Sequence, residues 1–297
     1  MTTVRYAVNP AAFHWYLPEL IADREGFFRE QGLLIEWNRL PKYPDKTSAY
    51  VRAMADGITD FYHCGEWVAV ARLLISEDGK AVAKSPPGDE TLNSSFTLFA
   101  RKGSDIRTLT DLKYKAVAVE EGTGSKYNLL EALEPFVTER ELKLVNISEP
   151  HKRFQALIKG TVDAAVLLGP WNRIAKLYGM IELVKLRRTR PTVLIVSNRL
   201  SDGVVRSLIY AINKAIKIIN KEALKYNKVC EEYLLQLASE IGIDLPDLSD
   251  VNLIDKWNLW EPYTYEELYS AASWMLNRKL IDGVPSRNVI RQLELTK

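Results

Sequence analysis

The sequence predicts an α/β protein of two lobes with a ligand cleft between them. The first observation is a signature that occurs twice, at 54–67 and at 157–171. Each copy reads as a helix end, a Gly-x-x-Asp turn, a short apolar strand, and a Gly and a Trp where a new helix begins. The second observation is an alternation of strand and helix patterns, which is typical of βαβ units and a mostly parallel sheet. Two such units predict two lobes with loops at the carboxyl ends of their strands, where open parallel sheets bind ligands.

The first lobe is predicted to begin with apolar strands and with helices whose first and last residues can be recognised in the sequence. Pro18 falls in a first helical turn, where the N–H that proline lacks would have no partner in any case. Gly32 and Gly57 end two helices, and Asp45 is expected to cap the second of them. The predicted elements are a strand at 4–8, a helix at 18–28, a strand at 33–37, a helix at 45–57, a strand from Phe61 and a helix at 68–75.

The second lobe repeats this order after a turn-rich break at 85–90. An apolar strand at 95–100 is predicted to carry the chain into this lobe, and an apolar segment at 192–197 returns it to the first. The predicted elements between them are strands at 116–119, 142–147, 163–168 and 181–186 and helices at 125–136 and 153–158.

The last third of the chain is predicted to be helical and to pack on the first lobe. One helix face is marked by apolar residues spaced three or four positions apart. They are Leu208, Ile212, Ala215 and Ile219. Two further helices are expected at 231–241 and 265–280. The predicted domains are lobe 1, at 1–98 and 192–297, and lobe 2, at 99–191.

Composition excludes several classes of protein. The chain has 297 residues, 47% of them hydrophobic, which suffices for a full core, and its net charge is only +2. Nucleic-acid binding is therefore not expected. No apolar run approaches a membrane span, and no export segment opens the sequence. The chain as given is predicted to be cytoplasmic, or extracytoplasmic if a leader has been removed. The two cysteines, Cys64 and Cys230, do not have the spacing of metal ligands, and the histidines do not have it either. No metal or cofactor is therefore predicted.

Six stretches carry a resemblance to a known family. They are Leu20–Leu33, Gly57–Asp60, Ser104–Lys113, Glu121–Ser125, Gly160–Ala164 and Gly169–Trp171. On these residues the chain resembles the type II periplasmic solute-binding proteins of the nitrate, sulfonate and taurine group, a superfamily that also contains thiamin pyrimidine synthases. The resemblance implies two hinged lobes, a small-molecule ligand and an ABC permease as partner. The chain departs from the family at Tyr114, where Gly is usual, and it lacks the cysteine-rich motif of the synthases.

Four loops are expected to converge on the cleft, at 9–16, 63–67, 121–125 and 169–172. The third is predicted to cradle a polar or anionic group, because glycines let the backbone approach a ligand and N–H groups at a helix start favour negative charge. The alternative is an ordinary helix-capping turn. Tryptophans at the loops would cover a flat ligand or fill gaps between helix and sheet. The expected ligand-binding residues are His14, Trp15, His63, Cys64, Glu66, Trp67, Gly122, Thr123, Gly124, Ser125, Gly169 and Trp171.

Cys64, His14 and His63 are the candidates for catalysis. A thiol needs a nearby base or a positive field to become a nucleophile. Neighbouring residues of a strand point to opposite faces, so His14 is an alternative to His63 as the base. The other interpretation of these residues is a small buried cysteine and hydrogen-bonded histidines.

Two main hypotheses of function follow. The first is capture of a small organic ligand, with an anion as one option, by hinge closure and without catalysis. The second is an intracellular enzyme on the same fold, a lyase, hydrolase or biosynthetic enzyme that uses Cys64 with His14 or His63. A sensory ligand-binding module is a third reading. Fold alone does not decide between them.

Overall fold

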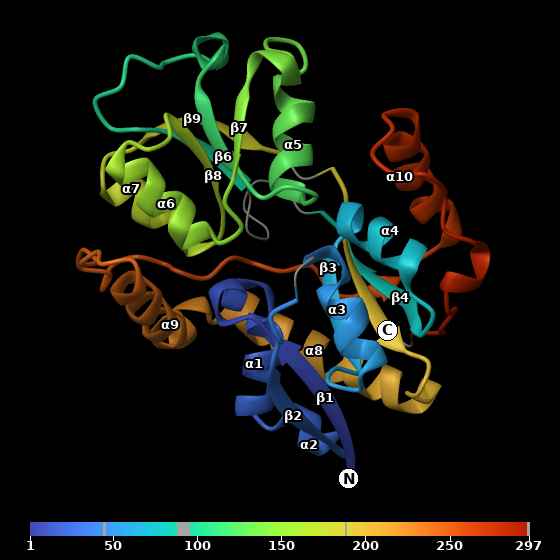
Figure 1. Cartoon of the computed structure of the whole chain (residues 1–297). Helices are drawn as coiled ribbons and strands as arrows, with labels where there is room; N and C mark the ends of the chain where they lie inside the picture. The colour runs from blue at the N-terminus through green and yellow to red at the C-terminus, as the bar shows by residue number, and fades with distance from the viewer. Residues whose placement is uncertain (44–45, 88–95, 188, 296–297) are drawn as a thin grey trace.

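The strands of the chain gather in two α/β lobes (Figure 1). The computed structural model describes residues 1–43, 46–87, 96–187 and 189–295, without the side chains of residues 46 and 47. The predicted cap at Asp45, the end of the turn-rich break at 88–90 and the first residue of the predicted strand, Ser95, lie outside the described residues.

Lobe 1 is built on two neighbouring sheets. Their strands are β1 (Thr2–Val8), β2 (Leu33–Arg39), β3 (Phe61–Gly65), β4 (Gly79–Ser85), β10 (Thr192–Ser197) and β11 (Glu261–Pro262). β1 and β2 pair in parallel, with Val4 opposite Ile35. The second sheet has the order β11-β4-β10-β3, and β10 runs antiparallel to both β3 and β4.

Lobe 2 holds one sheet in the order β7-β6-β8-β5-β9. Its strands are β5 (Phe96–Ala100), β6 (Ala116–Val119), β7 (Lys143–Asn146), β8 (Ala164–Leu167) and β9 (Ile181–Leu186). β6 is parallel to β7 and β8, whereas β5 is antiparallel to β8 and β9. In each lobe the strand that follows a crossing, β5 or β10, therefore runs antiparallel to both of its neighbours in the sheet. The domain boundaries set from the sequence remain a prediction.

Helices cover both lobes. They are α1 (Leu17–Arg24), α2 (Phe27–Glu30), α3 (Lys46–Ala55), α4 (Glu66–Ile75), α5 (Gly124–Leu133), α6 (Pro150–Lys159), α7 (Pro170–Leu177), α8 (Asp202–Lys221), α9 (Asn227–Glu240) and α10 (Tyr265–Asn277). Short 3₁₀ helices lie at Pro10–Trp15, Leu109–Leu112, Glu139–Glu141, Ala223–Tyr226 and Arg287–Val289. In lobe 2, α5 covers one face of the sheet, and α6 and α7 cover the other (Figure 1).

The left-handed backbone at Gly26 and at Tyr114 bears on the predictions from the sequence. The single helix predicted at 18–28 is wrong, because Gly26 has φ of 80° and separates α1 from α2. A residue with this φ cannot continue a right-handed helix. Tyr114 has φ of 62° and is exposed, at the turn where the resembling family usually has Gly. The backbone at Tyr114 thus has a conformation that favours glycine, although this chain has tyrosine at that position.

The C-terminal helices contact both lobes, so the prediction that they pack on lobe 1 is incomplete. α8 packs on α1 and α2, and α10 on α4, all in lobe 1. The Gln155 side chain of α6, however, donates a hydrogen bond to the Ile241 carbonyl at 2.7 Å, and Arg173 of α7 pairs with Asp255 at 2.5 Å. The chain after α9, orange in Figure 1, thus runs along the boundary between the lobes.

The repeated Gly-x-x-Asp turn has the same geometry in both lobes. Gly57 and Gly160 follow a helix with φ of 72° and 70°, the left-handed conformation that ends many helices. Asp60 Oδ2 accepts a hydrogen bond from the Arg5 backbone N–H of β1 at 2.8 Å. Asp163 Oδ2 accepts one from the Ala116 N–H of β6 at 2.9 Å. Each aspartate thus ties its turn to a strand of its own lobe, β1 in lobe 1 and β6 in lobe 2.

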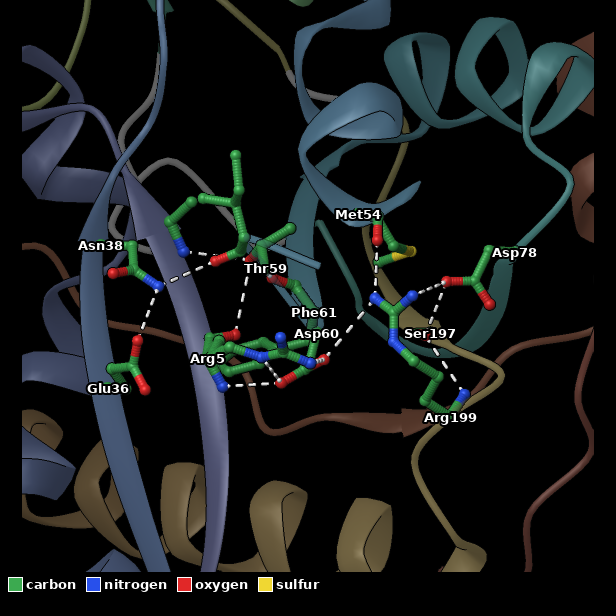
Figure 2. Close-up of polar contacts among 12 residues, drawn as sticks. Arg5, Glu36, Asn38, Met54, Thr59, Asp60, Phe61, Asp78, Ser197 and Arg199 are labelled. Atoms are coloured by element: carbon green, nitrogen blue, oxygen red, sulfur yellow. Dashed lines mark hydrogen bonds and ion pairs between the residues drawn. The ribbon is translucent and has the colours of Figure 1, made fainter. Parts of the chain in front are cut away.

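In lobe 1 this connection is reinforced by charge. The Arg5 guanidinium donates to both carboxylate oxygens of Asp60, at 3.0 and 2.9 Å, and Arg199 lies 3.7 Å away (Figure 2). Arg199 also contacts Asp78 at 3.2 Å and donates to the Met54 carbonyl at 2.6 Å. The buried Asp60 therefore holds β1, the turn and the end of β10 together.

Replacing Asp60 by asparagine is expected to lower the free energy of unfolding by about 2–3 kcal/mol, since charged hydrogen bonds are worth more than neutral ones. The matched control is Asp163→Asn, which removes a charge from the equivalent turn of lobe 2 and should cost about 1 kcal/mol. Chemical denaturation of both variants measures the difference. Equal losses would show that the Arg5 and Arg199 contacts add nothing.

Candidate functional site

A cavity of about 190 Å³ lies between the two lobes. Lobe 1 contributes the loop after β1, the end of β3 and the first turns of α4, and lobe 2 contributes the loops that lead into α5 and α6. The charged residues of the lining are Glu66, Arg72, Glu120, Glu149, Arg153 and Arg190. The lining also contains the aromatic residues Tyr6, Trp15, Tyr16, Tyr50, Trp67 and Phe96. The cavity is therefore both charged and aromatic.

The structure brings most of the expected residues to this cavity. Those that line it are His14, Trp15, His63, Cys64, Glu66, Trp67, Thr123 and Gly124. The lining found in the described residues does not include Gly122, Ser125, Gly169 or Trp171. Ser125 is buried, and its hydroxyl accepts a hydrogen bond from the Glu120 N–H at 2.7 Å. Thr123 caps α5 by accepting from the Ser125 N–H. The hydroxyls of Thr123 and Ser125 thus make hydrogen bonds within the loop.

The three tryptophans have different environments. Trp171 is fully buried and packs on Phe154, with 5.4 Å between ring centroids. Trp67 is 2% exposed and packs on Trp274 at 4.6 Å. Trp15 is only half-buried, is the last residue of a 3₁₀ helix, and lies beside Phe96, with 6.4 Å between ring centroids. Among the three, Trp15 offers the most accessible ring to a ligand.

Cys64 lies in a setting that keeps its thiol neutral. Burial raises the pKa of Cys64, and the neighbouring Arg72 guanidinium offsets only part of this effect. Arg72 is itself buried and lies over the rings of Tyr50 and Tyr62, at 4.7 and 5.1 Å. A nucleophilic cysteine needs the opposite shift. Cys64 and Cys230 are both free thiols.

The histidines are buried beside the cavity. Burial lowers the pKa of His14 to about 3, with a further contribution from Arg153, so its ring is neutral. Neither ring nitrogen of His14 finds a hydrogen-bond partner among the described residues. His63 Nε2 lies 3.2 Å from Glu19 Oε1, at ion-pair distance but without hydrogen-bond geometry. Its ring lies 5.6 Å from that of Trp260.

Arg153 is the residue that sequence reasoning missed. It lies in α6, is 1% exposed, and donates to the carbonyls of Val166, Ile147 and Ser148 at 2.6, 2.9 and 3.1 Å. Burial lowers its pKa to about 10, although the charges of Glu120 and Glu149 oppose this shift. It remains charged at neutral pH. The signal available in the sequence was an arginine one turn into a helix that follows a strand.

Glu66 is the acidic counterpart on lobe 1. It is the first residue of α4 and is 1% exposed. Tyr263 donates a hydrogen bond to its Oε1 at 2.6 Å. Burial raises the pKa of Glu66 to about 7, although the hydrogen bond from Tyr263 and the charge of Arg190 oppose this shift. The carboxyl group therefore titrates near neutral pH.

Within the described ranges, no group of three His, Cys, Asp or Glu side chains is placed to hold a metal ion. The described helices include none that is long and apolar enough to cross a membrane.

Similar solved structures share the fold over almost the whole chain. The alkanesulfonate-binding protein SsuA from Xanthomonas axonopodis pv. citri, bound to MOPS, is 18% identical, with 98% of this chain and 99% of that chain covered and a TM-score of 0.74. The periplasmic aliphatic sulphonate binding protein SsuA from Escherichia coli is 18% identical, with 100% and 93% covered and a TM-score of 0.69.

An enzyme is also among the similar structures. The desulfurization enzyme DSZB, in the form of a mutant in complex with biphenyl-2-sulfinic acid, is 15% identical, with 98% of this chain and 96% of that chain covered and a TM-score of 0.58. No family model matches the chain, and neither does a curated protein. The likeness establishes the fold, so the predicted two-lobed fold of type II periplasmic binding proteins is confirmed.

Proposed function

We propose that this chain, which has the fold of the sulfonate-binding proteins, is a solute-binding protein that captures a small organic anion between its lobes. The observation that carries the proposal is Arg153. It is a buried cation of the cavity lining, and in the described residues its guanidinium donates hydrogen bonds to three carbonyls, which are neutral groups. Burying a charge without an ionic partner in contact is costly. An anionic ligand supplies a charge in direct contact.

Closure of the lobes completes the site. Lobe 1 presents Trp15 and Arg72 to the cavity, and lobe 2 presents Phe96 and Arg153. A ligand that touches both walls stabilises the closed arrangement by its differential contacts. The half-buried ring of Trp15 and the neighbouring Phe96 then cover the organic part of the ligand, while Arg153 binds its anionic group.

The similar structures supply the first ligand class and partner to consider. Because two of them are named as sulfonate-binding proteins, alkanesulfonates are the first anions to test. One similar structure is the ligand-binding component of an ABC-type import system from Staphylococcus aureus, and this supports an ABC permease as partner. The periplasmic protein from Escherichia coli supports an extracytoplasmic location for the mature chain.

A thermal-shift experiment tests the proposal. A ligand that binds only the native state raises the melting temperature to an extent set by its concentration and affinity. Butane-1-sulfonate and other small organic anions should raise it, whereas neutral compounds of the same length, such as pentan-1-ol, should not. Equal shifts from the anionic and neutral series would contradict the proposal.

The enzyme hypothesis is supported by the desulfurization enzyme among the similar structures and is tested at Cys64. The Cys64 thiol is neutral and forms a hydrogen bond with Arg72. In Cys64→Ser a hydroxyl replaces the thiol, so a neutral polar group remains beside Arg72. We expect affinity for an anion to change by less than about twofold, or about 0.4 kcal/mol. Calorimetry measures this, with chromatography of the recovered ligand as a companion assay. Product formation by the wild type that disappears in the variant would establish catalysis instead.

A further inference from the structure

The chain between α9 and β11, residues 241–260, which we call the strap, is fixed to lobe 1 by asparagine side chains. Asn213 and Asn220 share a face of α8, because they lie seven residues, or about two turns, apart. Nδ2 of Asn220 donates to the Trp257 carbonyl at 2.7 Å, and its Oδ1 accepts from the N–H of the same tryptophan at 2.8 Å. Asn213 makes the same two hydrogen bonds with Trp260, at 3.1 and 2.7 Å.

A third asparagine, Asn227 at the start of α9, holds the strap in a similar way. It donates to the Val251 carbonyl at 2.8 Å and accepts from the Leu253 N–H at 3.0 Å. The side chains of Trp257 and Trp260 are buried, and buried backbone groups need hydrogen-bond partners of this kind. In lobe 1, α8 packs on α1, and α9 packs on the 3₁₀ helix after β1. The strap is therefore a firm part of lobe 1.

The strap also contacts lobe 2, beside which it runs in Figure 1. Arg173 of α7 lies 2.5 Å from Oδ1 of Asp255, and their side chains are only 27% and 18% exposed. Solvent screens a partly buried ion pair less than an exposed one. The Tyr178 hydroxyl, just after α7, donates to the Asp244 carbonyl, and the hydrogen bond from Gln155 of α6 is a further contact. These contacts join protein groups, so they form whichever ligand the cavity holds.

We propose that the strap stabilises the closed arrangement, in which the lobes enclose the cavity, as a third connection beside the two crossing segments. The strap moves with lobe 1, because each of the three asparagines bonds to it twice. Opening of the cavity therefore breaks the contacts of the strap with α6 and α7. The strap lowers the fraction of open molecules that accept a ligand. This device goes beyond the proposed function and operates for a ligand of any class.

Labelling of Cys64 in Arg173→Gln tests the proposal. Cys64 lines the cavity between the lobes, so a bulky neutral reagent such as N-(1-pyrenyl)maleimide reaches its thiol at a rate set by the fraction of open molecules. The protein is first unfolded and refolded to remove bound ligand. Peptide mass spectrometry distinguishes Cys64 from Cys230. Arg173→Gln should label at Cys64 about tenfold faster than the wild type, as expected for loss of one charge-assisted hydrogen bond.

Three further variants interpret the labelling rate, with circular dichroism confirming that each is folded. Lys176→Gln removes a charge from the same helix, but its partner Glu182, at 2.6 Å, belongs to lobe 2, so the rate should not change. The double variant of Arg173→Gln with Asp255→Asn should label no faster than Arg173→Gln alone, because both changes remove the same contact. Asn220→Asp loses the donor that fixes the strap to α8 and should also label faster.

Equal labelling rates at Cys64 in Arg173→Gln and in the wild type would overturn the proposal. An acceleration of the same size in Lys176→Gln would overturn it too, because that contact does not join the lobes. An unchanged rate in Asn220→Asp would show that the strap does not act through its attachment to lobe 1. Failure of organic anions to bind would contradict the proposed function and leave this inference standing, since the labelling uses protein without ligand.

Discussion

Replacing Arg153 by glutamine is expected to weaken the binding of a small organic anion by about a hundredfold, because truncating one partner of a buried charge pair costs about 2–5 kcal/mol. Arg153 is 1% exposed and lines the cavity, and its hydrogen bonds in the described residues are all to backbone carbonyls. Glutamine keeps a donor for one of these carbonyls but removes the charge. Calorimetry with butane-1-sulfonate measures the loss.

Two further variants show whether the loss of affinity comes from the charge of Arg153. Lys159→Gln makes the same change of charge at the exposed end of the same helix and should leave the affinity unchanged. Arg153→Lys keeps the charge but loses the planar fork of donors, so it should bind more tightly than Arg153→Gln and less tightly than the wild type. An Arg153→Gln protein that is folded and binds the anion as the wild type does would remove Arg153 from the site.

Replacing Gly169 by alanine is expected to hinder closure of the lobes and to weaken ligand binding by about tenfold or more. Gly169 is the N-cap residue before α7 in lobe 2 and has φ of 59° and ψ of −143°, a conformation that non-glycine residues adopt only at a cost of about 1–3 kcal/mol. A Cβ at this position would lie 2.9 Å from Cγ of His14 in lobe 1. The added methyl group therefore collides with the opposite lobe.

Small-angle X-ray scattering and calorimetry check this prediction together. Gly169→Ala should have a larger radius of gyration in the presence of ligand than the wild type has. Gly203→Ala, on the first turn of α8, has only Ser201 Oγ at 4.0 Å from the added Cβ and serves as the control. His14→Ala removes the ring and should restore part of the lost affinity in the double variant. Wild-type affinity in Gly169→Ala would show that this contact does not limit closure.

The repeat in the sequence predicts the fold well because its signals are local. A glycine ends a helix through its own φ, and the aspartate three residues later bonds to the strand beside it. Gly57 with Asp60 and Gly160 with Asp163 therefore mark the same turn in each lobe. The break at Gly26 was missed because the apolar pattern continues across it and the pattern alone does not report φ.

The site was only partly predictable from the sequence. Loop position brought Trp15, Cys64 and Glu66 to the cavity, as expected. It did not distinguish Trp15, which is half-buried, from Trp171, which fills the space between α7 and α6. The role of Arg153 depends on its burial and on three carbonyls from two segments, at Ile147 and Ser148 and at Val166, and these are properties of the tertiary structure. A helical arginine looks the same in the sequence whether it faces solvent or a ligand.

Native mass spectrometry with a competing panel of small molecules tests whether the protein binds a small organic anion through Arg153. The panel contains equal concentrations of organic anions, dipolar ions, cations and neutral compounds of similar mass. We expect a one-to-one complex with an anionic or dipolar member of the panel. The ligand should dissociate unmodified when the protein unfolds, and the complex should be lost in Arg153→Gln. Exclusive binding of a cation or a neutral compound, or a complex that Arg153→Gln retains in full, would contradict this expectation.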